Sequence, residues 1–236
     1  MAYVQGFVAA VPTANRAAYE AHARQAVDLF REFGTRRFVE AWGDDVPRGK
    51  RNDFQGAVQA RDDESVVFSW MEYPDRAARD AAFEKMMADP RMQSMPEMPF
   101  DGTRMILGGF QPFVEQGAGR GAYYDGYLLP VPQSARDAYR GLAEQAAAVF
   151  LEHGAVRVVE AWGDDVPEGK RTDFRRAVLL EDGEQVVFSW VEWPSRRVRD
   201  EAMPELMADP RMQPGEAMPF DGSRVVSGGF VAMVDE

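Results

Sequence analysis

The sequence predicts an α+β protein in which two ferredoxin-like (split βαβ) repeats pair within one chain into a single pseudo-symmetric barrel. Two observations carry this prediction. The second half of the chain repeats the first, and each half follows the order strand, helix, two or three strands, helix, strand. Such a half covers one face of its sheet with helices and leaves the other face apolar, so we expect the second copy to cover that face.

The repeat is visible directly in the sequence. Residues 2–116 align with residues 122–236 without a gap, and more than half of the aligned positions are identical. The most similar blocks are VEAWGDDVP, VVFSW, DPRMQ, MPFDG and GGF, each present once in either copy. We therefore divide the chain into a first repeat (1–114), a glycine-rich linker (115–121) and a second repeat (122–236).

Each element of the first copy has a local signal. Apolar residues at steps of three and four predict helices, aromatic and β-branched runs predict strands, and Pro, Gly and charged residues mark loops. We expect strands over 3–12, 36–43, 53–60, 66–73 and 104–114, one helix that ends at Gly34, and a second helix from Pro74 and Asp75 to about Ala88. In the second copy Pro204 replaces Glu84, and we expect it to kink or split that helix because proline lacks the amide donor.

Composition narrows the classes of function. The formal net charge is -12 and the isoelectric point is about 4.8, which disfavours nucleic acid and anionic membranes as partners. The absence of cysteine excludes disulfides, thiolate nucleophiles and thiolate metal sites. The apolar stretch at the N-terminus lacks a basic leader and is broken by Pro12, so we expect a cytoplasmic protein.

Alternation along the strands places glutamates beside tryptophans. Phe38, Glu40 and Trp42 share one strand face, Phe68, Trp70 and Glu72 share another, and the second copy repeats both with Val158, Glu160 and Trp162 and with Phe188, Trp190 and Glu192. If these faces line the barrel, burial raises the carboxyl pKa toward the range that suits acid-base catalysis. The candidate catalytic residues are Glu40, Glu160, Glu72 and Glu192, and the candidate ligand-binding residues are Trp42, Trp70, Trp162, Trp190, Arg104 and Arg224. The alternative is that the tryptophans are core and the glutamates pair with arginines such as Arg104 or Arg91.

Other chemical groups have simpler interpretations, and we expect no metal and no cofactor. The acidic residues Asp44, Asp45, Asp53, Asp164, Asp165 and Asp173 match no calcium loop and lie near Lys50 and Arg51, which favours a solvated turn. His22 and His153 fall in the first helix of their copies and are unmatched in the other copy, which excludes a haem ligand shared by both halves. Ser69 and Ser189 have no evident activating base. Gly108 and Gly109 predict a bulge or a close strand approach rather than a dinucleotide loop. Phe100 and Phe220 could plug the barrel mouth or cover a ligand as a lid, and we favour the structural role.

Taken together, VEAWGDDVP, FSW followed by Glu72 and Pro74, DPRM, MPFDG and GGF resemble the YbaA-like family of uncharacterised bacterial proteins (domain of unknown function 1428). The resemblance covers essentially the whole of each copy. That family is similar to the dimeric α/β-barrel superfamily, in which two ferredoxin-like chains pair. The resemblance therefore implies that duplication has fused the pair into a dimeric-α/β-barrel-like pseudo-dimer within one chain. It implies no catalytic residue, and the activities of the wider superfamily, cofactor-free monooxygenases among them, are an analogy of fold.

The leading functional hypothesis is small-molecule binding in an enclosed barrel cavity that bears Glu40, Trp42 or their second-copy equivalents. A cofactor-independent enzyme that uses a buried glutamate as acid or base is one form of it. The alternative is a non-catalytic structural or protein-interaction module with a filled barrel. We expect a monomer, because the fused chain supplies both halves of the barrel.

Overall fold

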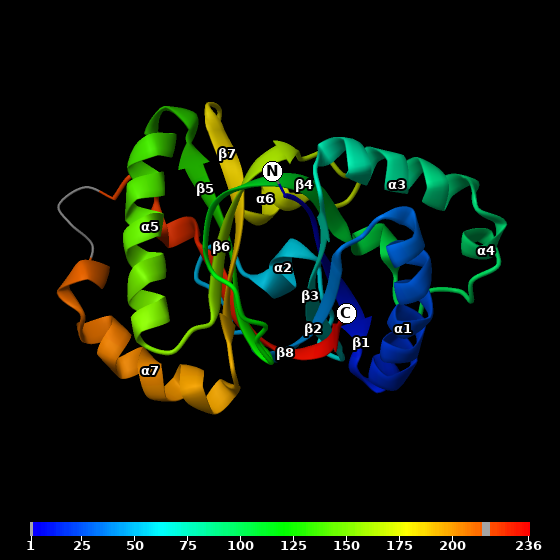
Figure 1. Cartoon of the computed structure of the whole chain (residues 1–236), viewed down its shortest axis with the longest axis horizontal. Helices are drawn as coiled ribbons and strands as arrows, with labels where there is room; N and C mark the ends of the chain where they lie inside the picture. Colours follow the sequence, from blue (N-terminus) through cyan, green and yellow to red (C-terminus); the bar gives the residue numbers. More distant parts are fainter. Residues whose placement is uncertain (1, 214–217) are drawn as a thin grey trace.

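The computed structural model describes residues 2–213 and 218–236 and has a mixed α/β fold around an eight-stranded antiparallel barrel (Figure 1). The first repeat contributes β1 (Tyr3–Pro12), β2 (Arg37–Asp45), β3 (Glu64–Tyr73) and β4 (Ile106–Gly117), and the second contributes β5 (Tyr123–Pro132), β6 (Arg157–Asp165), β7 (Glu184–Trp193) and β8 (Val226–Asp235). The order around the barrel is β1-β3-β2-β8-β5-β7-β6-β4. The halves therefore meet at two strand pairs, β2 with β8 and β4 with β6, and neither repeat closes the barrel alone.

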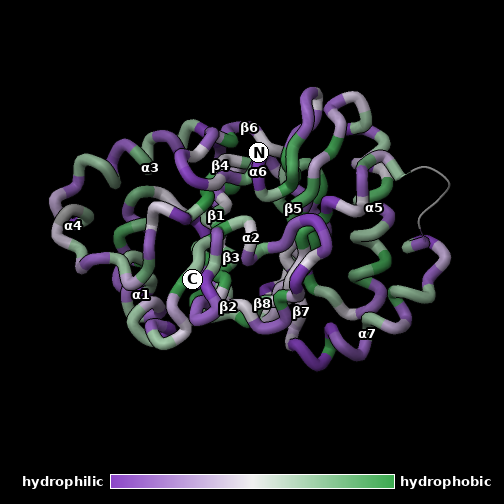
Figure 2. Tube along the Cα trace, turned by 180° about the vertical axis from the view of Figure 1, so that it is seen from behind, coloured by the Kyte–Doolittle hydropathy of each residue, from purple (hydrophilic) through white to green (hydrophobic). Residues whose placement is uncertain are grey.

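Helices cover the barrel on two opposite sides (Figure 1). The first repeat supplies α1 (Arg16–Phe33), α3 (Arg76–Ala88) and the short α4 (Pro90–Gln93), and the second supplies α5 (Arg136–Glu152) and α7 (Arg196–Ala208). One-turn helices α2 (Phe54–Ala57) and α6 (Phe174–Ala177) lie near the centre, and 3-10 turns occupy Thr13–Asn15, Gly102–Arg104, Gln133–Ala135, Pro210–Met212 and Gly222–Arg224. The tube in Figure 2 shows hydrophobic segments along the central strands. The predicted end of the first helix is confirmed, since Gly34 caps α1 with a φ of +112°.

The interior of the barrel is packed with aromatic side chains. Phe68 and Phe188 stack with ring centroids 4.6 Å apart, and Trp70 and Trp190 lie 4.5 Å apart in the next layer. These rings belong to one cluster of buried side chains that both repeats supply. A Cβ on Gly6 would lie 2.8 Å from the Phe188 ring, so the strands carry glycine where the rings need room. The prediction of a barrel cavity is therefore wrong, because the inner faces carry large aromatic residues that fill the space.

One predicted strand is wrong. Residues 53–60 do not pair with β3, and residues 54–57 within them form the helix α2. The Asp53 side chain caps this helix by accepting a hydrogen bond from the Gly56 amide at 2.6 Å. The helix buries Phe54 against Phe68 and Phe230 in the barrel. One helical turn is too short to show periodicity in a sequence, so a short apolar run is equally consistent with a strand.

Three local expectations have clear outcomes. Pro204 does not split the second helix of its repeat, because α7 spans the positions that correspond to α3. Of the two alternatives for the paired glycines, the structure favours the bulge, since the β4 to β6 register shifts after Gly109. A Cβ on Gly109 would lie 2.3 Å from the Tyr3 hydroxyl oxygen, so a side chain rather than a neighbouring strand makes the close approach there. The first residues of the predicted linker, Glu115 to Gly117, are the last residues of β4. In the described part of the chain, no helix combines the length and apolarity needed to cross a membrane.

Candidate functional site

Two of the four candidate glutamates form ion pairs at one end of the barrel. Glu192 is fully buried and accepts hydrogen bonds from both Arg37 Nη atoms at 2.7 and 2.8 Å and from Arg157 Nη1 at 3.1 Å. Glu72 accepts from Arg157 at 2.7 and 3.0 Å. Burial opposes ionisation of Glu72, but the Arg157 guanidinium outweighs it and holds the pKa of this carboxyl below its usual value. This is the ion pairing of the alternative interpretation, although Arg37 and Arg157 supply it rather than Arg104 or Arg91.

The candidate ligand-binding residues also have structural partners. Trp70 and Trp190 are fully buried and donate their indole N–H groups to Glu72 and Glu192. Trp42 and Trp162 lie on the outer face of the sheet, where Arg16 and Arg136 stack over them at 5.4 and 5.1 Å. Arg104 pairs with Glu64 and Arg224 with Glu184, each through a contact of 2.6 Å. These residues hold the fold together, and their proposed binding role stays a prediction.

The paired aspartates join the two repeats. Asp164 and Asp165 contact Arg76 and Arg79 of the first repeat at 2.8 and 2.7 Å, and Asp44 and Asp45 contact Arg196 and Arg199 of the second at 2.9 and 3.3 Å. Lys50 and Arg51 are therefore not their partners, because helices α3 and α7 of the opposite repeat bring arginines closer. Among the described residues, no group of three or more acidic or histidine side chains is arranged to hold a metal ion.

Unlike Glu72 and Glu192, Glu40 has no arginine partner among the described residues. It lies on the outer face of β2, beneath α1, so the prediction that Phe38, Glu40 and Trp42 line the barrel is wrong. Its Oε2 accepts hydrogen bonds from the Tyr19 hydroxyl at 2.7 Å and from the Ser69 hydroxyl. Burial raises the pKa of Glu40 to about 7, against the opposing effect of these two bonds.

The second repeat has the same arrangement. Glu160 Oε2 accepts from the Tyr139 hydroxyl at 2.7 Å, and burial likewise raises the pKa of Glu160 to about 7. Burial and the adjacent carboxyl raise the pKa of both tyrosines well above the ordinary value, so the tyrosines remain donors. Each repeat therefore holds one carboxyl that is close to half-protonated at neutral pH, a state in which it can either accept or donate a proton.

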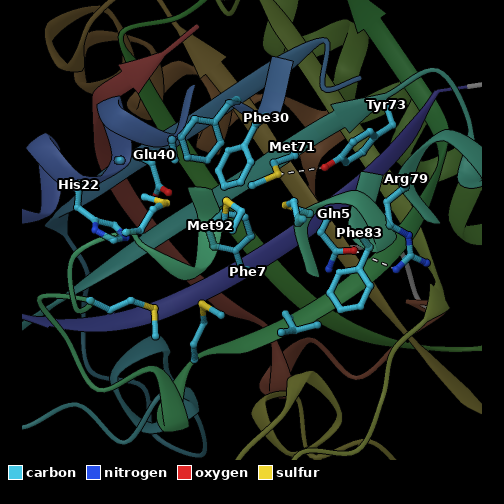
Figure 3. A pocket seen from close by; sticks show the side chains of 18 of the residues that line it. Gln5, Phe7, His22, Phe30, Glu40, Met71, Tyr73, Arg79, Phe83 and Met92 are labelled. Carbon is cyan, nitrogen blue, oxygen red and sulfur yellow. Dashed lines mark hydrogen bonds between the residues drawn. The ribbon is translucent and has the colours of Figure 1, made fainter. Parts of the chain in front are cut away.

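A pocket of about 750 Å³ lies beside Glu40, between the outer face of the first repeat's sheet and helices α1, α3 and α4 (Figure 3). Its wall is mainly aromatic and methionine side chains, including Phe7, Phe30, Phe38, Phe83, Phe100, Met71, Met86, Met92, Met95, Met98 and Met105. The exposed fractions of Phe83 (55%) and Leu107 (43%) place them at the opening. Of the predicted site residues, Glu40 alone belongs to this wall in the described structure.

The apolar wall also carries polar and charged side chains. His22 lies near Glu40 in Figure 3, and its Nδ1 is buried without a hydrogen-bond partner. Desolvation lowers the pKa of His22, which favours the neutral imidazole. Gln5 and Arg79 lie on the other side of the pocket in this view, and Asp165 of the second repeat completes the wall beside Arg79. His22 is therefore a pocket residue rather than a simple helix-surface residue, and Phe100 contributes to a pocket wall rather than to the barrel mouth.

The two repeats differ at the positions that form this pocket. Trp193 stands where the first repeat has Tyr73, is fully buried, and donates its indole N–H to Asp125 at 2.9 Å. Asp125 stands at the position of Gln5 and pairs with Arg199 at 3.0 Å, while Leu142 replaces His22. Apart from Glu40, the candidate residues shared by both copies lie outside this pocket, and positions at which the copies diverge, such as His22 and Leu142, mark it instead.

The fold and the pocket define an α/β-barrel protein whose candidate site lies beside the barrel rather than inside it. The model of the family described as "Protein of unknown function (DUF1428)" matches residues 2–102 and again residues 122–222. The chain therefore belongs to this family, and it contains two tandem copies of the family's domain.

Individual relatives agree with this assignment. The uncharacterized protein YbaA of Escherichia coli K12 is 55% identical over 115 residues, which cover 48% of this chain and 98% of YbaA, and YbaA of Shigella flexneri matches equally well. A putative monooxygenase from Lactobacillus acidophilus superposes with a TM-score of 0.54 at 10% identity, covering 100% of this chain and 96% of that one. A putative monooxygenase from Fusobacterium nucleatum has a TM-score of 0.50 at 10% identity, with 100% and 94% covered. At such identities the likeness shows the fold alone.

Proposed function

We propose that the first repeat binds a small, mainly apolar molecule in the pocket beneath α1 and α3, and that Glu40 is its acid-base group. The observation that carries the proposal is a buried carboxyl without a cationic partner in the wall of an apolar pocket. Both hydrogen bonds to Glu40 use Oε2, which leaves Oε1 for a polar atom of the bound molecule.

The size and lining of the pocket support this proposal. Pockets for small molecules typically enclose about 300 to 1,000 Å³ and combine apolar walls with a few convergent polar groups. Each 100 Å² of apolar ligand surface removed from water contributes on the order of 2.5 kcal/mol before the cost of association. A carboxyl with a pKa of about 7 is suited to proton transfer at neutral pH without a cofactor.

A fluorescence titration with the neutral, apolar probe N-phenyl-1-naphthylamine tests binding. Ala26 lies on the face of α1 that lines the pocket, so the Ala26→Phe side chain would occupy ligand space. We expect the wild-type protein to enhance the probe's emission and the variant to bind it at least about tenfold more weakly, which corresponds to about 1.4 kcal/mol.

The duplication supplies a matched control. Ala146 is the equivalent residue of the second repeat, and Ala146→Phe is expected to leave probe affinity unchanged. Equal weakening by both variants, or no saturable binding to the wild type, would contradict the proposed pocket. The latter result would favour the alternative of a non-catalytic interaction module, with which the filled barrel also agrees. Circular dichroism melting of each variant separates lost binding from lost folding.

We also propose that the chain is a fused pair of ferredoxin-like units, with repeats at 1–114 and 122–236 joined by a linker at 115–121. We further propose that the protein is a monomer and is located in the cytoplasm. The strand order β4-β1-β3-β2 in one half and β8-β5-β7-β6 in the other supports the fused pair. Since one chain supplies all eight strands of the closed barrel, the described residues leave no sheet edge for a second chain to extend. Light scattering is expected to give the mass of one chain, 26.4 kDa. Twice that mass at micromolar concentration would contradict the monomer.

A further inference from the structure

We infer that the molecule bound in the first repeat's pocket is a lipophilic cation, such as an aromatic amine in its protonated form or a quaternary onium ion. This inference rests on the proposed function and adds the charge class of the ligand. It is carried by the balance of charged side chains in the pocket wall and by the aromatic rings among them.

Carboxylates outnumber cationic groups in the wall. Glu40, Asp80, Glu84 and Asp165 line the pocket, whereas Arg79 is the one arginine or lysine of the described wall. Arg79 is not available to a ligand anion, because its Nη2 lies 2.7 Å from Asp165 Oδ2 and its guanidinium covers the Tyr3 ring at 5.1 Å. A bound anion would therefore lose its hydration without gaining a partner, which disfavours it strongly in an apolar site.

A cation, in contrast, finds two kinds of favourable contact. Glu40 is the one carboxyl of the wall that is deeply buried and lacks a cationic partner, so a bound cation supplies the missing counter-charge. The faces of aromatic rings attract cations, and Phe7, Phe30 and Tyr73 lie around the pocket in Figure 3. Methionine thioethers adapt to the shape of a bulky apolar ligand. His22 does not compete as an internal cation, since its surroundings favour the neutral ring.

The size of the pocket favours an organic cation over an inorganic one. About 750 Å³ of mainly apolar space cannot replace the hydration shell of a small metal ion, which needs several oxygen ligands close together. A delocalised or alkyl-substituted cation is weakly hydrated and brings apolar surface of its own, so both its charge and its surface match the wall.

Isosteric probes of opposite charge test this inference directly. Tetraphenylphosphonium and tetraphenylborate have nearly the same shape, and triphenylphosphine oxide is a neutral relative. Each is titrated as a competitor of N-phenyl-1-naphthylamine at about 0.5 M salt, where screening within a few ångströms suppresses attraction to the acidic surface. We expect tetraphenylphosphonium to bind at least about tenfold more tightly than tetraphenylborate, a difference of about 1.4 kcal/mol.

Substitution of the buried carboxyl locates the preference. Glu40→Gln is expected to lower the affinity for tetraphenylphosphonium about tenfold and to change the affinity for triphenylphosphine oxide by less than about twofold. Glu160→Gln removes the same charge from the other repeat and is expected to change neither affinity. Asp80→Asn is a second pocket variant at an exposed position, and we expect it to lower the affinity for tetraphenylphosphonium less than Glu40→Gln does.

The outcomes separate this inference from the proposed function. Equal affinity of the wild-type protein for the two ions would overturn the inference, as would an equal loss of tetraphenylphosphonium affinity in Glu40→Gln and Glu160→Gln. Binding of the naphthylamine probe would still support a pocket in either case. Tighter binding of tetraphenylborate would overturn it as well. Failure of every probe to bind the wild-type protein would overturn the proposed function itself.

Discussion

Glu192→Ala is expected to lower the free energy of unfolding by about 3 to 5 kcal/mol, the loss typical when one partner of a buried ion pair is removed. Glu192 is fully buried and accepts hydrogen bonds from Arg37, Arg157 and the Trp190 indole. The substitution leaves two guanidinium groups in the closed end of the barrel with fewer acceptors, although Arg37 keeps Asp235 at 2.8 Å. Urea unfolding followed by circular dichroism measures the change.

An exposed ion pair provides the control for this prediction. Glu152 pairs with Arg211 at 2.6 Å, but both side chains are about half exposed. Solvent screens such pairs, so Glu152→Ala is expected to change the unfolding free energy far less than Glu192→Ala does. A loss below about 1 kcal/mol in Glu192→Ala would show that the network at the barrel end does not hold the halves together.

Glu40→Gln is expected to make the fold more stable than the wild type at pH 8 but not at pH 4.5. The pKa of Glu40 is raised by burial to about 7 from an ordinary 4.5, so between these values the folded protein binds a proton that the unfolded chain has released. The contribution of Glu40 to the free energy of unfolding therefore falls as pH rises from about 4.5 to 7, and its full cost of about 3 kcal/mol is reached above pH 7. Glutamine keeps an acceptor for Tyr19 and does not titrate.

The measurement is the difference in unfolding free energy between variant and wild type across pH 4.5 to 8. Taking a difference removes the contribution of carboxylates whose pKa is lowered, such as Glu72, since these titrate equally in both proteins. Glu160→Gln is expected to behave in the same way, and the two effects should add because the sites lie in separate repeats. A difference that does not grow with pH would show that Glu40 is ionised at an ordinary pKa.

The stability cost of Glu40 bears on its role. A carboxyl that destabilises the fold at neutral pH contributes little as a structural group, whereas a group held near half-protonation is suited to chemistry or to a charged ligand. Both repeats retain this carboxyl with its tyrosine and serine, but the surrounding walls have diverged. We therefore expect function to concentrate in the first repeat, with the second completing the barrel and supplying Asp165.

Much of the fold could be predicted because local sequence patterns indicate its elements. The duplication, the order of the long strands and helices and the cap at Gly34 follow from internal similarity, periodicity and glycine at a helix end. The one-turn helix at Phe54 could not be predicted with the same means, since four residues show no period and the helix forms where Phe54 packs into the barrel.

Internal similarity and strand alternation are enough to establish that this protein is a duplicated α/β chain and that Glu40 shares a strand face with Trp42. They do not establish that this face lies under a helix while the face of Trp70 points into the barrel, which depends on how the strands and helices pack. The physical reason is that alternation along a strand defines two faces without saying which is inside. When both faces are apolar, as in a barrel covered by helices, that choice depends on packing between segments far apart in the sequence.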